Sequence, residues 1–330
     1  MPLYSAVGCI VLLTLSLLVV PVAPTAQPRG NIPRIGVLEL GSQQAPLGCL
    51  GAFRQGLHDL GYVEGHNITI AYRYAEGQRG RLSTLAAELV RLTPDVLWTH
   101  STPAALAAKQ ATSTIPIVLG VANDLVEQGL VESLERPGSN LTGLELRDVE
   151  LLGKRLELFK EAVPTISRVA ILVDPSERAH AHVPSNIEAE ARALRMQLQR
   201  VEGGHPEAFE AAFVAMVQGG TDALIIMDTA FFVKHRLQLL EFAARYRLPT
   251  ISGTRGFAET GSLLAYGARV ADLCQHSAVF MDKLLKGATP ADLPVERADK
   301  FYLVVNLKTA EALGLTLPPT FLYRADEVIK

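Results

Sequence analysis

The sequences TPDVL at residues 93–97 and GTDAL at residues 220–224 decide the fold that we expect for this chain. Each carries the chain from a helical stretch into a short apolar strand, of the kind that parallel sheets bury on both faces. Strands are expected in the first half at residues 35–40, 68–74, 95–100 and 115–120, and in the second half at residues 169–173, 199–202, 223–227 and 249–252. Corresponding elements are offset by roughly 130 residues, so two similar lobes explain the sequence better than one extended sheet.

Short polar side chains follow these strands at their carboxyl ends, where open parallel sheets bind ligands. In the first half they are Ser42, Glu76, Ser101, Thr102, Asn123 and Asp124, and in the second half they are Asp174, Ser176, Asp228 and Thr229. Hydroxyl and carboxylate groups suit a small polar ligand, but the same residue types are also the ordinary caps of helices. Thr102, beside Pro103 at a helix start, would offer its hydroxyl and free amides to a carboxylate.

Charged and aromatic side chains near the expected cleft have two interpretations each. Asp228 would meet an ammonium group of a ligand, or it would cap the helix that begins near Phe231. Arg255, between two glycines, would grip a carboxylate with both arms of its guanidinium, or it would form a hinge salt bridge. The aromatic rings of Phe231, Phe232 and Tyr266 would stack on a ligand ring, although core packing is the common fate of such side chains.

The motifs of several enzyme classes are absent from the sequence. No G-x-G-x-x-G follows the first strand, and neither a Walker motif nor a G-x-S-x-G elbow occurs. His100 ends a strand beside Ser101, but no nucleophile or orienting group can be assigned to it. His180 and His182 lie near Asp174 without the spacing of a zinc site. We therefore expect a protein that is not an enzyme and that holds neither a metal nor a cofactor.

The charge of the chain limits the classes of binding partner that we expect. The formal net charge of −3 and the pI near 6.3 give no electrostatic case for binding nucleic acid or an anionic membrane. Trp98 lies inside a strand and is expected in the core. Of the three cysteines, Cys49 and Cys274 lie outside the leader described next. We expect two separate buried thiols, and the sequence leaves open whether they form a disulfide instead.

An apolar run at residues 7–20, followed by Pro21, Ala23, Pro24 and Ala26, predicts a secretory signal peptide over residues 1–26. The run is shorter than the roughly 20 residues that span a bilayer. Because residues 1–6 carry no lysine or arginine, an uncleaved anchor is the alternative. We expect cleavage after Ala26 and export to the periplasm.

Several short motifs together resemble a family of bacterial ABC-transporter substrate-binding proteins. They are RPG (136–138), NLTG (140–143), GKRLEL (153–158), KEAVP (160–164), AYG (265–267), ADL (271–273), LLKG (284–287), ADLPVE (291–296) and VVNLKTA (304–310). The resemblance covers nearly the whole chain after the leader. It implies the type I periplasmic-binding fold, in which two Rossmann-like lobes joined by three crossovers close over a solute and pass it to a membrane permease.

The resemblance also bears on the site. Some relatives bind tryptophan or other aromatic amino acids. The positions that match the family's cleft are Thr102 with Pro103 and Ala104, Asn123 with Asp124, and Asp228 with Thr229. Ser139 replaces a frequent glycine, and the loop after Asp174 reads PSER, which lies at the cleft and differs from the family. Ligand identity therefore does not transfer.

The expectation is an α/β protein with two Rossmann-like lobes, parallel sheets and a ligand cleft between them. The first lobe would comprise residues 34–142 and 253–298, to which residues 263–267 and the helix at 271–285 return, and the second would comprise residues 143–252 and 299–330. Crossovers would lie near Gly143, Ser252 and Phe301. The expected ligand-binding residues are Ser42, Ser101, Thr102, Asn123, Asp124, Asp174, Ser176, Asp228, Thr229, Arg255 and Tyr266.

The expected function is that of the extracytoplasmic solute-binding component of an ABC importer. Such a monomer would capture a small polar or aromatic amino-acid-like ligand by hinge closure and deliver it to an ABC permease. Two other classes remain open at this point. One is a ligand-sensing receptor lobe without transport, and the other is an exported enzyme on the same fold.

Overall fold

The computed structural model describes residues 32–330 apart from residues 44–47, 178–179 and 181–184. The expected signal peptide lies outside the described residues. Pro33–Lys330 form one compact unit, to which all the elements described below belong. Within the described residues, no helix is both long and apolar enough to cross a membrane.

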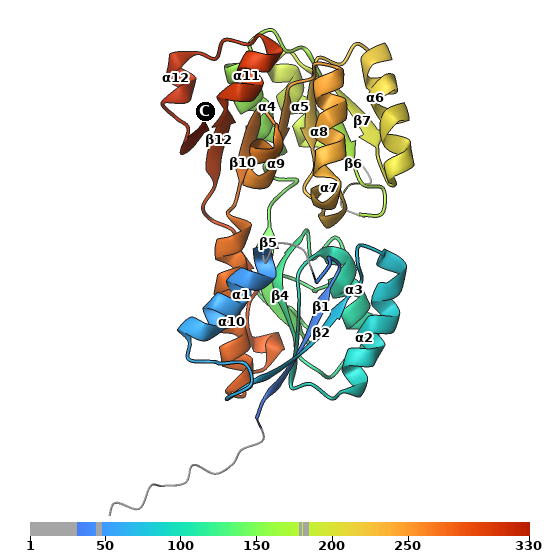
Figure 1. The fold of residues 1–330 in the computed structure, drawn as a ribbon, viewed down its shortest axis with the longest axis vertical. Helices are drawn as coiled ribbons and strands as arrows, with labels where there is room; N and C mark the ends of the chain where they lie inside the picture. Colours follow the sequence, from blue (N-terminus) through green and yellow to red (C-terminus); the bar gives the residue numbers. More distant parts are fainter. Residues whose placement is uncertain (1–31, 44–47, 178–179, 181–184) are drawn as a thin grey trace, which may run out of the picture. The chain divides into compact units, whose positions relative to one another are not determined.

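The first sheet has six strands in the order β11-β5-β4-β3-β1-β2, and all of its strand pairs are parallel (Figure 1). The strands are β1 (Arg34–Glu39), β2 (Thr69–Tyr74), β3 (Val96–Thr99), β4 (Ile117–Asn123), β5 (Leu141–Leu146) and β11 (Glu296–Arg297). The helices beside it are α1 (Gly48–Asp59), η1 (Arg79–Arg81), α2 (Leu82–Arg91), α3 (Thr102–Ala111), α10 (Val270–Leu285) and η4 (Pro290–Asp292).

The side chains of β1 explain why helices cover both faces of this sheet. Ile35 and Val37 belong to the core with α1 and α10, whereas Leu38 joins the core with α2 and α3. This alternation follows from the two-residue period of a strand. Trp98 of β3 is fully buried, as expected, and its indole donates a hydrogen bond to the Ser277 hydroxyl at 3.0 Å.

The second sheet has seven strands in the order β13-β12-β10-β9-β8-β6-β7, and only the β10–β12 pair is antiparallel among those described. The strands are β6 (Arg168–Val173), β7 (Gln197–Glu202), β8 (Ala223–Ile226), β9 (Thr250–Ser252), β10 (Leu264–Gly267), β12 (Tyr302–Asn306) and β13 (Glu327–Ile329). The helices are α4 (Leu152–Ala162), α5 (Ser185–Ala193), η3 (Pro206–Ala208), α6 (Phe209–Gln218), α7 (Ala230–Lys234), α8 (Arg236–Arg245), α9 (Arg255–Thr260), α11 (Leu307–Leu313) and α12 (Pro319–Leu322).

The two sheets define two lobes whose limits differ from the expected ones at two strands. β10, expected in the first lobe, pairs with β9 and β12 in the second sheet. β5, most of which was expected in the second lobe, pairs with β4 and β11 in the first. The chain therefore leaves the first sheet after Leu146, returns after Gly267 and leaves it again after Arg297. β10 lies in the second sheet because only the short helix α9 separates it from β9. A brief β-α-β connection keeps consecutive parallel strands in one sheet.

Cys49 of α1 and Cys274 of α10 form a disulfide, with their Cα atoms 5.3 Å apart. The expectation of two separate thiols is wrong. Although 225 residues separate the two cysteines in sequence, α10 (orange) returns to lie beside α1 (blue) in Figure 1. Gly56 permits the close approach, because a Cβ at this position would collide with the Gln275 carbonyl. Neither helix alone carries a signal of this contact.

We predict that the disulfide stabilises the protein, because it closes a long loop in the unfolded chain. Reducing agent should lower the free energy of unfolding by about 2–4 kcal/mol. Urea denaturation with and without reductant measures the effect. A Cys49→Ala/Cys274→Ala variant is the control and should not respond to reductant, whereas an unresponsive native chain would contradict the prediction.

Candidate functional site

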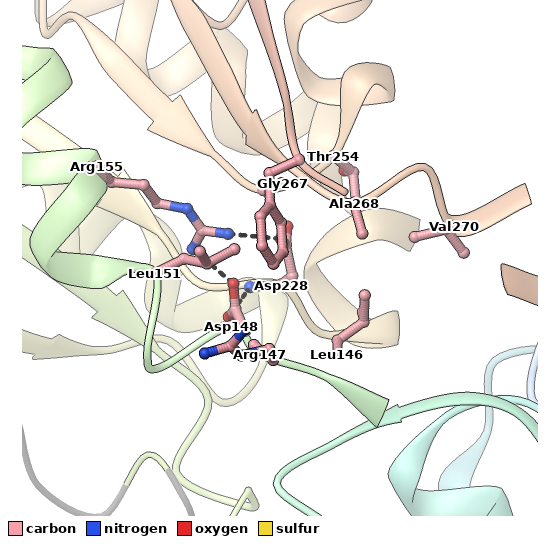
Figure 2. A pocket seen from close by; sticks show the side chains of 12 residues that line it. Leu146, Arg147, Asp148, Leu151, Arg155, Asp228, Thr254, Gly267, Ala268 and Val270 are labelled. Atoms are coloured by element: carbon pink, nitrogen blue, oxygen red, sulfur yellow. Dashed lines mark hydrogen bonds and ion pairs between the residues drawn. The ribbon is translucent and has the colours of Figure 1, made fainter. Parts of the chain in front are cut away.

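Arg155 is the charged side chain on which the site is built. It lies in α4, and only 1% of its side chain is exposed. Its Nη1 lies 2.5 Å from Asp148 Oδ1, its Nη2 lies 3.3 Å from Asp228 Oδ2, and its Nε donates to the Tyr266 carbonyl at 3.0 Å (Figure 2). Asp148 follows β5 where the chain passes between the lobes. The Arg155 guanidinium thus connects the segment after β5, where the chain crosses between the lobes, to the ends of β8 and β10.

The two carboxyl groups beside Arg155 share one negative charge. Burial raises the pKa of Asp228 well above its ordinary value, and the neighbouring Asp148 raises it further. Burial also opposes ionisation of Asp148, but the Arg155 guanidinium and the Asp228 amide, which donates to Asp148 Oδ2 at 2.9 Å, outweigh it and lower the pKa of Asp148. The arrangement therefore favours an ionised Asp148 and a protonated Asp228.

Two glycines make room for this cluster. A Cβ at Gly253, after β9, would collide with the Asp228 carboxyl group and with the Arg155 guanidinium. A Cβ at Gly267 would collide with the Gly253 carbonyl. A small pocket opens beside the cluster (Figure 2), and the residues that line it include Leu146, Asp148, Thr254, Ala268 and Phe301. Backbone thus approaches the buried charges where side chains would block it.

Asp124, at the end of β4, lies in an acidic environment. Burial and, to a smaller extent, the neighbouring Asp148 and Glu145 carboxyl groups together raise the pKa of Asp124 to about 8. Its φ of 49° is a left-handed conformation that aspartate tolerates better than most residues. Burial and the neighbouring Asp174 raise the pKa of Glu177 to about 7 against the opposing effects of Arg79 and of a hydrogen bond from Thr102.

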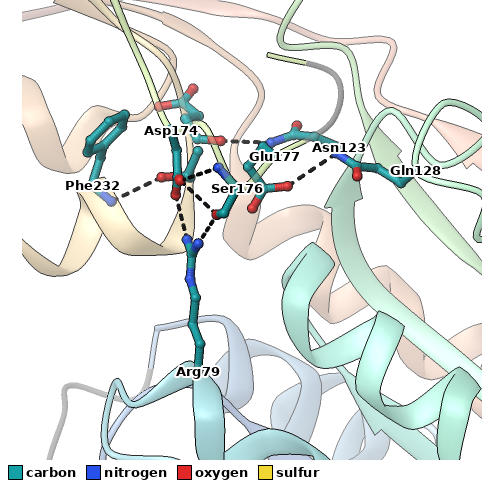
Figure 3. Close-up of polar contacts among 9 residues, drawn as sticks. Arg79, Asn123, Gln128, Asp174, Ser176, Glu177 and Phe232 are labelled. Atoms are coloured by element: carbon teal, nitrogen blue, oxygen red, sulfur yellow. Dashed lines mark hydrogen bonds and ion pairs between the residues drawn. The ribbon is translucent and has the colours of Figure 1, made fainter. Parts of the chain in front are cut away.

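Hydrogen bonds join the strand ends of the first lobe to those of the second (Figure 3). The Asn123 amide donates to the Asp228 carbonyl at 2.7 Å, and the Gln128 amide donates to Glu177 Oε2 at 3.2 Å. Arg79, which begins η1, reaches Asp174 at 2.5 Å. Residues from the carboxyl ends of the two sheets thus face one another directly.

Buried polar atoms without hydrogen-bond partners gather at the same place. Within the described residues they are Arg79 Nε, Ser101 Oγ, Asn123 Oδ1, Asp124 Oδ2, Asp148 Oδ1, Arg155 Nη1, His180 Nδ1 and Asp228 Oδ1. Asp148 Oδ1 and Arg155 Nη1 face each other as an ion pair, which leaves the others. Because folded proteins pair nearly all their buried polar atoms, such a concentration indicates a site for water or a ligand.

The structure brings together most of the candidate residues. Ser101, Thr102, Asn123, Asp124, Asp174, Ser176 and Asp228 lie in or beside the facing strand ends, and Ser42 is half-buried after β1. Tyr266 lies near the Arg155 cluster, with its ring centroid 6.1 Å from that of Phe301. Thr229 caps α7, because its hydroxyl accepts the Phe232 amide hydrogen at 3.0 Å.

Arg255 does not join the other candidates. Its half-exposed side chain pairs with Glu259 of α9 and Glu327 of β13, and both partners belong to the second lobe. Neither the ligand contact nor the hinge salt bridge expected for Arg255 describes these pairs. His180 is buried, and burial lowers its pKa. In the part of the chain that the structure describes, no group of three or more potential ligands could hold a metal ion, and His182 lies outside that part.

Arg155 is the main residue that sequence reasoning missed. A signal was present, because Leu152, Arg155, Leu156 and Phe159 share one helix face at the spacing i, i+3, i+4 and i+7, and all four are buried. A charged residue within such an apolar stripe requires a buried partner. The sequence gives no indication that the partners are Asp148 and Asp228.

We predict that Asp124 makes the stability of the protein depend on pH. Its pKa of about 8 exceeds the ordinary value of 3.8, so the folded state retains a proton that the unfolded chain loses. The native chain should therefore lose stability as pH rises from about 4 to 8. In Asp124→Asn this loss should disappear, so the variant should gain about 4 kcal/mol relative to the native chain between pH 5 and pH 9.

Urea denaturation at the two pH values measures this difference. Asn tolerates a left-handed backbone, so the substitution preserves the turn. Asp292→Asn is the matched control, because Asp292 is exposed in η4. Parallel pH profiles of Asp124→Asn and the native chain would refute the role of Asp124.

Two mostly parallel α/β lobes with polar strand ends facing each other define a type I periplasmic-binding protein. The profile of the family described as "ABC transporter substrate binding protein" matches residues 34–329. The chain belongs to this family. Its members are extracytoplasmic binding proteins rather than enzymes, and their partners are a small-molecule ligand and an ABC permease.

Comparisons with individual proteins agree with the family. A tyrosine-binding protein of Clostridioides difficile (strain R20291) is 28% identical over 267 residues, which cover 80% of this chain and 75% of that protein. The structure of an ABC domain from Streptococcus pneumoniae in complex with L-Trp is 24% identical with a TM-score of 0.84, and the match covers 90% of this chain and 99% of that one. A ligand-free, open substrate binding protein from Clostridium difficile is 25% identical with a TM-score of 0.66, covering 91% and 100%.

Proposed function

We propose that this chain is the periplasmic solute-binding component of an ABC importer, and that it closes two lobes over a small amine, such as an aromatic amino acid. The observation that carries the proposal is the cluster of unpartnered buried polar atoms on the facing strand ends. A binding protein must keep such atoms free for its ligand, whereas a purely structural interface would pair them.

The chemistry of these atoms favours an ammonium group. Ser101 Oγ, Asn123 Oδ1, Asp124 Oδ2 and Asp228 Oδ1 all accept hydrogen bonds, and an ammonium group has N–H donors for such oxygens. Asp148, Glu145 and Glu177 add negative charge around Asp124. The guanidinium of Arg155 is already engaged by two carboxyl groups. A cationic group of the ligand would therefore lower the electrostatic cost of this cleft.

The other end of an amino acid has a separate partner. α3 begins at Thr102 with Pro103 next, after strand β3, and the first amides of a helix have no partner within the helix. A carboxylate at this helix start would interact with the positive end of the helix dipole. The relatives named for tyrosine and solved with L-Trp support an aromatic side chain on the ligand.

Hinge closure is supported by the contacts between the lobes. Asn123, Gln128 and Arg79 of the first lobe all bond to groups of the second. The TM-score of 0.84 to the L-Trp complex exceeds the 0.66 to the ligand-free open protein, at nearly equal sequence identity. This difference is what a closed arrangement of the lobes would produce.

We predict that binding requires the ligand's amino group. Isothermal titration calorimetry should detect binding of both L-tyrosine and tyramine, which carry the amino group. The affinity for the deaminated analogue 3-(4-hydroxyphenyl)propionate should be lower by about 10- to 100-fold, because it lacks one charged hydrogen-bonding group. Asp124→Asn should weaken tyrosine binding similarly, while the control Asp292→Asn should not. Equal affinity for the deaminated analogue would contradict the proposed ligand class.

The importer role has its own test. Cells that lack the gene should lose uptake of the radiolabelled ligand, and the recovered ligand should be chemically unchanged after incubation with the purified protein. Unimpaired uptake would favour a sensor that acts without transport. A chemically altered ligand would favour an enzyme on this fold.

A further inference from the structure

Arg79 lies at an unusual place for a charged side chain that sequence reasoning did not select. It begins η1, shortly after β2 in the first lobe. All of its described side-chain contacts are with the second lobe. Its Nη2 lies 2.5 Å from Asp174 Oδ2, its Nη1 contacts the Ser176 hydroxyl, and its guanidinium lies 5.4 Å from the ring centroid of Phe231. Figure 3 shows the side chain reaching from η1 to the loop after β6.

The acceptor for Arg79 is organised within the second lobe itself. Asp174 is fully buried, and its Oδ1 accepts hydrogen bonds from the Ser176 amide at 3.0 Å and the Ser176 hydroxyl at 2.7 Å. These local bonds hold the carboxylate in place and leave Oδ2 for the guanidinium. Such preorganisation reduces the entropy that would be lost on pairing.

A neighbouring contact supports the same docking. Lys234 of α7 occupies the space that a Cβ would take at Gly77, two residues before Arg79. Gly77 has a φ of 74°, which glycine adopts without strain. The segment that carries Arg79 therefore lies against α7, the helix that also supplies Phe231. Backbone and side chain of this segment both fit the second lobe.

We propose that Arg79 is a clasp that holds the two lobes closed and sets the rate of ligand release, without selecting the ligand. The inference rests on the proposed function. Opening the lobes would separate Arg79 from Asp174, Ser176 and Phe231 together. A guanidinium that pairs with a buried, prearranged carboxylate forms a strong hydrogen bond, and its planar fork is what lysine lacks. Arg79 is thus a positioning residue for closure.

The first test measures closure without any ligand. Spin labels at residues 91 and 241, which are exposed in the first and second lobes, report the distance between the lobes by double electron–electron resonance. Arg79→Ala should shift the ratio of closed to open molecules toward open by about 10- to 100-fold, and Arg79→Lys by less. Arg81→Ala is the matched control, because Arg81 lies exposed in the same short helix.

The second test measures release of L-tyrosine by stopped-flow fluorescence. Arg79→Ala should raise the dissociation rate constant by the same factor and change the association rate constant little. Asp174→Asn should raise the dissociation rate constant by a similar factor. The double variant should dissociate no faster than Arg79→Ala, because both substitutions remove the same interaction. Circular dichroism checks that each variant is folded.

The outcomes separate the clasp from the proposed ligand. Distance distributions of Arg79→Ala that match those of Arg81→Ala would overturn the clasp, whatever the protein binds. A shift toward the open state supports it even if L-tyrosine does not bind, a result that would count against the proposed ligand alone. Equal dissociation rate constants for Arg79→Ala and the control Arg81→Ala would also overturn it.

Discussion

The buried ion pairs of Arg155 hold the strand ends on which the site depends. Taking a guanidinium and two carboxyl groups out of water costs several kcal/mol per ion, and only close pairing offsets such a cost. The raised pKa of Asp228 and the lowered pKa of Asp148 limit the cost, because they favour a neutral Asp228 and leave Asp148 and Arg155 as the charged pair. Through Arg155, Asp148 in the segment between the lobes is connected to the ends of β8 and β10. The same cluster places the Asp228 carbonyl where Asn123 of the other lobe donates to it.

Around this cluster the protein keeps polar groups that a structure built only for stability would pair or remove. Asp124 shares its surroundings with Glu145, Asp148 and Glu177, and its pKa of about 8 expresses the unfavourable energy of ionising there. The unpartnered oxygens on neighbouring strands are also unfavourable for folding, because they are buried without a hydrogen-bond donor. Under the proposed function, a ligand cation with N–H donors would relieve both, and this relief would contribute to its binding free energy. Contacts such as the Arg79 bond to Asp174 lie beside these oxygens and join lobe to lobe.

Much of the fold could be predicted because each strand is a local apolar run, and candidate site residues such as Ser101 and Asp124 follow from the rule that sites lie at carboxyl strand ends. The predictions that failed concerned contacts between residues that lie far apart in the sequence. The pairing of β10 depends on the short α9 connection, and the disulfide depends on a helix that returns from far along the chain. Arg255 has the residue type of a ligand contact but turns toward Glu327 on its own lobe. Arg79 and Arg155 lack a local signal of their partners, because those partners belong to other segments.

The central claim is that the facing strand ends of both lobes form one ligand site. Hydrogen–deuterium exchange with and without L-tyrosine tests it most directly, because exchange reports opening of backbone amides segment by segment. If the strand ends form one site, L-tyrosine should slow exchange in both lobes together, at the start of α3 near Thr102, around Asn123 and Asp124, and in the loop after β8 that contains Asp228. Protection confined to one lobe, or located away from these strand ends, would contradict it.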